Sequence, residues 1–263
     1  MSLATSLLST IDDGPVRRLT ISNPGRLNAI PPDGWDLLRA AFDEFRRSPQ
    51  RVLVVTGAGG AFCSGADLAD GGFEPEAGVA ANVAWMRRPG AAATALHRLG
   101  KPTVAAVDGV AAGAGMNLAL GCDIVIATER ARFSEIFVKR GLALDFGGTW
   151  LLPRIVGRAA AIDLALTGRM VGAAEALAMG LVARVVPVDQ LEATVAETAG
   201  ALASGAPLAQ RFIKTGLDRT ETMSFEQAIA YESQSQGVLL SSADAAEALA
   251  AFVAKRPPRF QGR

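Results

Sequence analysis

Lys101 to Thr128 reads KPTVAAVDGVAAGAGMNLALGCDIVIAT and contains the most hydrophobic segment of the chain. β-Branched and apolar residues form strand-like runs at its two ends, Thr103–Asp108 and Ile124–Thr128. Small residues and glycines fill the segment between the runs, a pattern typical of a turn that opens a helix. This order of strand, turn, helix and strand predicts a buried part of an α/β fold.

Further strand-like runs lie on both sides of this stretch, at Val16–Ile21, Arg51–Thr56 and Val182–Val186. Apolar residues recur at helical spacing through residues 31–49, and Pro49 ends that pattern before the next strand. Strands and helices therefore alternate along the first part of the chain, which predicts the α/β fold class.

The pattern changes after Trp150, where helix-like segments follow one another with little strand between them. The segments that begin SFEQ and SSAD each fit the pattern of a helix start. We predict a core over residues 1–200 and a helical region over residues 201–263. The apolar faces of these helices need a partner surface, either the body of the protein or another subunit.

The segment from Ala69 to Ala95 combines glycines, two prolines and weak periodicity. These features predict the most mobile segment of the chain.

The composition excludes several classes of protein. Of the 263 residues, 50% are hydrophobic and 20% charged, which is enough apolar material for a sizeable core. Lys plus Arg and Asp plus Glu both total 26, so neither nucleic acid nor a membrane surface is an expected partner. The hydrophobic segment is interrupted by charged residues and glycines, unlike a membrane helix. The start of the chain lacks the pattern of a secretory signal, so we expect a cytoplasmic protein.

The chain has two cysteines and one histidine. Cys63 and Cys122 lie in apolar, glycine-rich surroundings, which predicts buried hydrophobic residues and no metal site. His97 stands where a helix is expected to end before Pro102, and we predict a structural role for it.

Two glycine-rich stretches each follow a strand: TGAGGAFCSGADL from Thr56, and DGVAAGAGMNLALGCD from Asp108. Neither contains the complete motif of a dinucleotide site, a P-loop or a nucleophile elbow. Close packing of strand against helix is one interpretation. The other is a pair of turns whose free N–H groups converge on one ligand oxygen, as in an oxyanion hole.

Five segments, in this order along the chain, resemble the enoyl-CoA hydratase/isomerase (crotonase) family. They are NPGRLNAI, VVTGAGGAFCSGADL, the stretch from Lys101 to Thr128, GLALDFGGTWLLPRIVGRAAAIDLALTG and SSADAAEALAAFVAKRPPRF. The resemblance implies a spiral of ββα units, a C-terminal helical region used in trimer formation, and an acyl-CoA thioester as substrate. It also implies a homotrimer or dimer of trimers, and no cofactor beyond the coenzyme A of the substrate.

The resemblance places the oxyanion donors at the backbone N–H groups of Ala66 and Ala114. It also implies substrate-binding positions on three segments. These are Arg26, Leu27, Ser64, Asp67, Leu68, Phe252 and Lys255. For Arg26 and Lys255, a solvated surface position is an equally good interpretation.

The sequence departs from the hydratases of the family at both of their glutamate positions, which are Asn117 and Phe137 here. Both residues remain candidates for contact with substrate, but neither can activate water or protonate carbon. Glu135 could substitute, although on a strand or turn its side chain is expected to face elsewhere.

Asp145 is the remaining carboxylate, in GLALDFGGT. The family's isomerases often keep a carboxylate at this position, and the sequence most resembles the branch of the family that contains 1,2-epoxyphenylacetyl-CoA isomerase and dienoyl-CoA isomerases. An apolar setting would raise its pKa toward that of a general base. We therefore predict an isomerase of an unsaturated or aromatic-derived acyl-CoA with Asp145 as acid/base. The alternatives are a cap on the following helix for Asp145, and for the protein a hydratase or a non-catalytic acyl-CoA binder.

Overall fold

The computed structural model describes residues 7–69 and 77–263, and within them a six-stranded sheet runs in the order β1-β2-β3-β4-β6-β9. β1 and β2 are antiparallel, and every other neighbouring pair in this sheet is parallel. The strands are β1 (Leu8–Asp13), β2 (Val16–Ile21), β3 (Val52–Gly57), β4 (Thr103–Val107), β6 (Ile124–Thr128) and β9 (Arg184–Val186). The predicted α/β class is confirmed.

A smaller sheet has the order β5-β7-β8. Its strands are β5 (Val110–Ala112), β7 (Arg132–Ser134) and β8 (Val171–Gly172). The chain passes twice from the main sheet to the small sheet and then to a helix, first as β4, β5 and α4 (Ala114–Leu120), then as β6, β7 and α5 (Gly148–Thr167). Between these last two elements runs the 3-10 helix η3 (Ile136–Arg140). This repeat is the spiral of ββα units that the resemblance implies.

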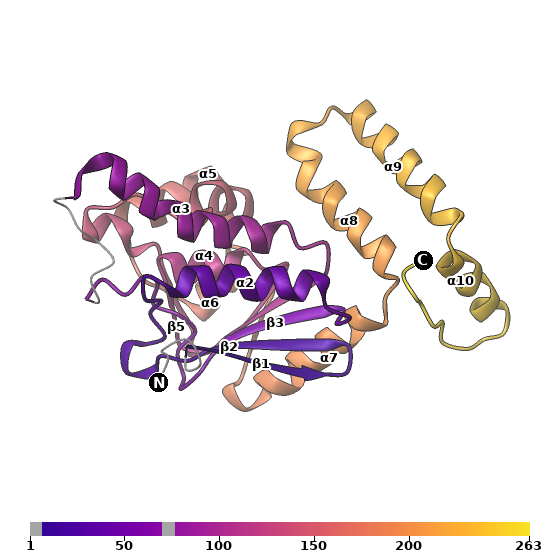
Figure 1. The fold of residues 1–263 in the computed structure, drawn as a ribbon, viewed down its shortest axis with the longest axis horizontal. Helices are drawn as coiled ribbons and strands as arrows, with labels where there is room; N and C mark the ends of the chain where they lie inside the picture. Colours follow the sequence, from indigo (N-terminus) through magenta and orange to yellow (C-terminus); the bar gives the residue numbers. More distant parts are fainter. Residues whose placement is uncertain (1–6, 70–76) are drawn as a thin grey trace.

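Helices cover both faces of the main sheet. α2 (Gly34–Arg47) and α3 (Gly78–His97) lie side by side on one face, and α7 (Leu191–Ser204) covers the other (Figure 1). Because β3 and β4 lie between these layers, all residues of β4 and all but the last of β3 are buried. Burial on both faces explains why these strands read as unbroken apolar runs.

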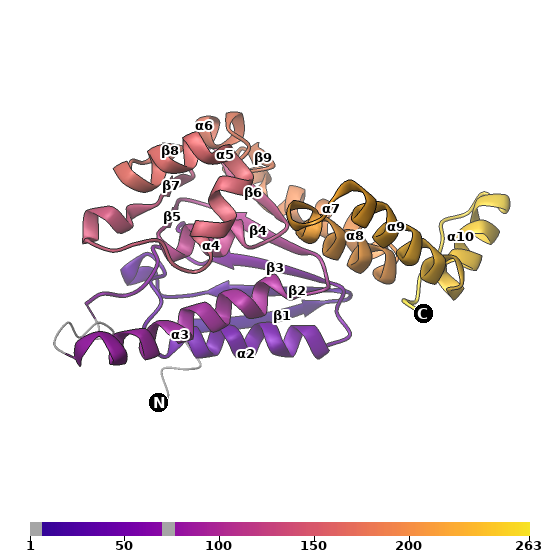
Figure 2. The same ribbon diagram turned by 90° about the horizontal axis from the view of Figure 1, so that it is seen from above.

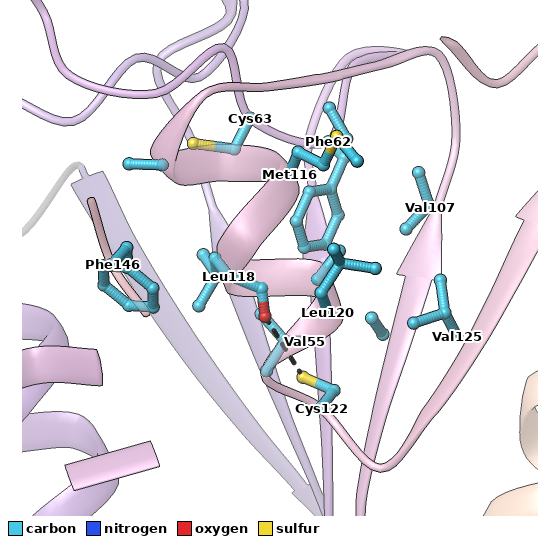
Figure 3. Packing of buried hydrophobic residues seen from close by; sticks show 14 of the residues in the cluster. Val55, Phe62, Cys63, Val107, Met116, Leu118, Leu120, Cys122, Val125 and Phe146 are labelled. Carbon is cyan, nitrogen blue, oxygen red and sulfur yellow. Dashed lines mark hydrogen bonds between the residues drawn. The ribbon is translucent and has the colours of Figure 1, made fainter. Parts of the chain in front are cut away.

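α4 is buried along its whole length in the main core. Its side chains Met116, Leu118 and Leu120 belong to the same buried cluster as Phe62 and Val107 (Figure 3). Such a short helix has little stability alone, so its position depends on this packing.

Two aspartates interrupt the apolar stretch around α4, and both are paired. Asp108 accepts hydrogen bonds from Arg130 and, at 2.8 Å, from the Thr128 hydroxyl. Asp123 accepts the Thr103 N–H at 2.7 Å and pairs with Lys214 Nζ at 2.8 Å. The charges therefore lie at strand ends, where they fix neighbouring segments without entering the core.

α8 (Pro207–Arg219), α9 (Phe225–Leu240) and α10 (Ala243–Val253) extend away from the main sheet (Figures 1 and 2). A capping box at Ser224 and Gln227 opens α9, and the Ser242 hydroxyl accepts the Ala245 N–H at the start of α10. The two helix starts predicted here are confirmed. The division into 1–200 and 201–263 stays a prediction; α7 spans this boundary.

The segment Ala69–Ala95, predicted to be the most mobile, is helical over most of its described length, and its mobility stays a prediction. Residues 70–76 lie outside the described residues, but α3 covers Gly78–His97, with Pro89 inside it. Its periodicity is weak because only Pro89, Ala92 and Leu96 are buried. None of the helices in the described ranges combines the length and hydropathy that crossing a membrane requires.

Candidate active site

The two glycine-rich stretches meet through their backbones. Cys63, after β3, forms an isolated parallel bridge with Ala111 of β5, and its carbonyl accepts the Ala112 N–H at 2.9 Å. A Cβ on Gly115 would overlap the carbonyl group of Cys63, so the start of α4 can approach this segment only with glycine there. A Cβ on Gly65 would lie 3.4 Å from the Ala114 nitrogen, so the two turns are in contact.

The backbone N–H groups of Ala66 and Ala114 are both free. Ala114 is the first residue of α4, where an N–H has no partner within the helix. The bridge between Ile30 and Ala66 uses the Gly65 carbonyl and the Asp67 N–H, so the Ala66 N–H faces the other side. Neither N–H donates a hydrogen bond within residues 7–69 and 77–263. Two free donors on touching turns are what an oxyanion hole requires.

Replacing Gly115 with alanine should lower the free energy of unfolding by about 1–3 kcal/mol, since the added methyl group must displace the Cys63 backbone. Gly200→Ala in α7 is the control because its methyl group would meet nothing within 4 Å. That variant should gain about 0.4–1 kcal/mol. Urea unfolding measures both. Equal stability of the two variants would show that the turns are not in tight contact.

The loop predicted to contact coenzyme A packs on the first turn. Ser64 donates its N–H to the Leu27 carbonyl and its hydroxyl to the Arg26 carbonyl, both at 3.0 Å. Arg26 Nη1 lies 3.4 Å from Asp67 Oδ1, and this carboxylate is buried. Leu27 and Leu68 are half exposed. The structure therefore brings these five predicted residues together, and their contact with substrate stays a prediction.

Sequence reasoning missed Asn28, which organises this loop. Its side chain is fully buried, and Nδ2 donates to the carbonyls of Ala58 at 2.8 Å and Ala61 at 2.7 Å. Its Oδ1 accepts the Asn23 N–H at 2.8 Å. The sequence signal that could have revealed it is an amide side chain placed between Leu27 and two apolar residues. An amide in such surroundings is expected to be buried, and a buried amide needs several hydrogen-bond partners.

Asn117 links the second turn to Asp145. It lies one turn into α4, with its N–H donated to the Gly113 carbonyl, and its side chain is fully buried. Nδ2 donates to the Asp145 carbonyl oxygen at 2.9 Å and to Glu135 Oε2 at 3.4 Å. The helix that begins with the free Ala114 N–H thus also holds the Asp145 backbone.

The Asp145 side chain does not cap α5. The residue before that helix is Gly147, no side chain caps its first turn, and Asp145 Oδ1 is buried without a hydrogen-bond partner in the described structure. The capping interpretation is therefore wrong. Burial raises the pKa of Asp145 to about 6, which suits a general base at neutral pH.

The expectation for Glu135 is also wrong. Its carboxyl group does not face away from the site but reaches Asn117, and the residue is fully buried. Burial raises its pKa to about 8; the hydrogen bond from Asn117 opposes this shift, and the charge of Asp145 adds to it. The turn that follows β7 is the 3-10 helix η3, which directs Glu135 inward.

Phe137 is buried beside the second turn. A Cβ on Gly113 would lie 3.6 Å from the tip of its ring, so the ring forms an apolar wall next to Ala114. Asn117 and Phe137 are therefore both at the site, and neither supplies an acid or base. Their contact with substrate stays a prediction.

Phe252 and Lys255 do not reach this site in their own chain. Phe252 is in α10 and 81% exposed, and Lys255 follows the helix; α10 lies at the far end of the molecule from α4 (Figure 2). Their predicted contact with coenzyme A stays a prediction that requires a second copy.

The two cysteines are buried, and the histidine packs against an aromatic ring. Cys63 and Cys122 are free and buried, and burial raises the pKa of each thiol to about 12. His97 ends α3, with its ring edge-on to Trp150 at a centroid distance of 5.2 Å. Among the described residues, no three His, Cys, Asp or Glu side chains are placed to hold a metal ion.

Comparisons with known proteins agree with this arrangement. The family model for enoyl-CoA hydratase/isomerase matches residues 13–263. The chain is 39% identical over 260 residues to 1,2-epoxyphenylacetyl-CoA isomerase of Escherichia coli, and the match covers 98% of each protein. It is 35% identical over 251 residues to short-chain-enoyl-CoA hydratase of Clostridium acetobutylicum, and this match covers 93% of each protein. The crystal structure of enoyl-CoA hydratase from Bacillus anthracis matches with a TM-score of 0.92 at 30% identity, covering 98% of this chain and all of that one. The chain belongs to the enoyl-CoA hydratase/isomerase family and is an acyl-CoA enzyme of that family.

Proposed function

We propose that the protein isomerises an unsaturated or aromatic-derived acyl-CoA, with Asp145 as the single acid/base. The observation that carries this proposal is the buried Oδ1 of Asp145, which has no partner in the part of the chain that the structure describes and lies in a loop tied through Asn117 to the helix that presents the Ala114 N–H. A base and an anion site joined by one rigid helix suit proton transfer next to a thioester carbonyl.

The reaction needs no oxidant and no second substrate. Ionised Asp145 takes a proton from a carbon of the acyl chain, and the electron pair of that C–H bond moves toward the thioester oxygen. The N–H groups of Ala66 and Ala114 stabilise the enolate by hydrogen bonds to this oxygen. Asp145 then returns the proton to a different carbon, which shifts the double bond and restores the carboxylate.

Hydration is less well supported. It needs one group to activate water and another to protonate carbon. The resemblance assigns Asn117 and Phe137 to the positions of those groups, and the Glu135 carboxyl is fully buried against Asn117. Similarity to a hydratase nevertheless keeps hydration as the second candidate.

We also propose that the enzyme works as a homotrimer or dimer of trimers, without a cofactor. Large apolar side chains on α8, α9 and α10 are exposed in the single chain, which supports association through these helices. They include Leu217, Phe225, Leu240, Leu249 and Phe252.

A panel of acyl-CoA substrates tests the reaction. We expect a shift of the double bond in an unsaturated acyl-CoA, with deuterium from heavy water placed at the protonated carbon unless the carboxyl group shields its proton from exchange. Crotonyl-CoA should be hydrated slowly or not at all. Rapid hydration would identify a hydratase, and binding without turnover of any substrate would identify a non-catalytic binder.

A further inference from the structure

Glu135 is a buried carboxyl group that the proposed reaction does not use. It stands between β7 and η3 and is fully buried. Its Oε2 accepts a hydrogen bond from Asn117 Nδ2 at 3.4 Å, and Oε1 has no partner in the described part of the chain. A carboxylate without a cation is costly in such a place, so its protonation state matters.

The hydrogen bonds around Glu135 lack a donor. Three buried side-chain oxygens that have no partner within residues 7–69 and 77–263 lie on residues joined by Asn117: Asn117 Oδ1, Glu135 Oε1 and Asp145 Oδ1. Both protons of the Asn117 amide are accounted for, by the Asp145 carbonyl and Glu135 Oε2. A proton on Glu135 would turn one of its oxygens into a donor, and no other side chain of these three can supply one while Asp145 acts as a base.

The charged groups nearby also favour a protonated Glu135. Among the described residues, the charge of Asp145 raises the pKa of Glu135, and α4 and β5 contain no ionisable side chain. Two cations belong to α5: Arg154 stacks on Trp150, and Arg158 is exposed. The cations on the elements that precede and follow Glu135 are all exposed; they are Arg132, Lys139 and Arg140. No cation therefore stabilises an ionised Glu135 within the described residues, whereas the Asp145 charge opposes its ionisation.

We propose that Glu135 is a positioning residue that keeps its proton through turnover, so that Asp145 carries the only charge of the pair. The proposal rests on the proposed isomerase reaction. A neutral Glu135 donates its proton within the cluster and fixes the Asn117 and Asp145 geometry. An ionised Glu135 places a second negative charge beside the site where the enolate forms, and the enolate is then harder to make.

This arrangement sets the pH dependence. The pKa of Asp145 is raised to about 6 and that of Glu135 to about 8, both first by burial. Asp145 loses its proton as the pH rises through the lower value, which turns activity on. Glu135 loses its proton through the higher value, which turns activity off. Turnover should therefore rise and then fall with pH.

The first test compares the pH profiles of the wild type and Glu135→Gln. Glutamine is neutral and a donor at every pH. Wild-type turnover should fall by about tenfold per pH unit above the upper limb, and Glu135→Gln should lose that limb but keep the lower one. An upper limb that persists in Glu135→Gln overturns the proposal.

A second test does not depend on turnover. Infrared spectra of the substrate-free protein at neutral pH should show the carbonyl band of a buried, protonated carboxyl group. The band should remain in Asp145→Asn, vanish in Glu135→Gln, and vanish from the wild type as the pH rises past the upper limb. A band lost in Asp145→Asn instead, or no band, contradicts the proposal. If Glu135→Gln does not fold, the wild type and Asp145→Asn decide. If no acyl-CoA is isomerised, the proposed function fails while this spectrum still reports on Glu135.

Discussion

Replacing Asp145 with asparagine should lower turnover by a factor of about 10²–10⁴ while acyl-CoA binding is largely kept. Asparagine has nearly the same size, but it cannot take a proton from carbon. Turnover is measured on whichever acyl-CoA proves to be a substrate, and binding by calorimetry. Binding should persist because the free Ala66 and Ala114 N–H groups do not depend on the carboxylate.

Asp163→Asn is the matched control. Asp163 is a carboxylate of α5 that pairs with Arg169 at 2.7 Å on the surface, and a pair of this kind contributes little to stability. Its variant should keep wild-type turnover. Loss of turnover in both variants would indicate a general effect of removing a negative charge. Wild-type turnover in Asp145→Asn would contradict the isomerase mechanism.

Stability gives Asp145→Asn a second readout. The pKa of Asp145 is raised from 3.8 to about 6, so its contribution to stability is fully present below the lower value and is lost as the pH rises through the higher one. Above that pH the wild type carries the cost of a buried charge that asparagine does not have. The melting temperature of Asp145→Asn should then equal or exceed that of the wild type, whereas removing a helix cap would lower it.

β3, β4 and β6 could be predicted from sequence because they are buried on both sides over most of their length, and β2 because its side chains alternate between buried and half-buried. β2 and β6 begin and end where their β-branched runs do, and β3 and β4 differ from the prediction by single residues. The short strands β5, β7 and β8 have two or three residues, too few for a pattern to emerge. β1 was not predicted, because nearly all of its side chains are exposed and its sequence therefore does not alternate between apolar and polar residues.

The site was predictable where it depends on backbone, and less so where it depends on side-chain direction. Glycines and other small residues predicted the turns at Ala66 and Ala114, because only such residues allow the close contact at Gly115. The direction of the Glu135 side chain depends on one 3-10 turn after β7. The sequence contains no periodic pattern that would predict this turn. Asp145 was found through the family resemblance, and the absence of a partner for its Oδ1 among the described residues became visible only in three dimensions.

Replacing Ala114 with proline should reduce turnover by about 10²–10³ while the fold is kept, since loss of one oxyanion donor costs that much in rate. Ala114 is the first residue of α4, and its N–H has no partner in the helix. Proline is favoured at this position because the missing N–H would be unpaired in any case. The substitution therefore removes the proposed donor with little other change, and single-turnover kinetics on the substrate measures the loss.

Ala243→Pro provides the control, because Ala243 is the first residue of α10 and is exposed, far from α4 (Figure 2). Both variants remove one N–H at a helix start, so both should melt near the wild-type temperature. Only Ala114→Pro should lose turnover, and its loss should appear chiefly in the chemical step because the enolate oxygen gains more from a donor than the neutral thioester oxygen does. A folded Ala114→Pro variant with wild-type turnover would show that the thioester oxygen does not bind at these turns, whatever the role of Asp145.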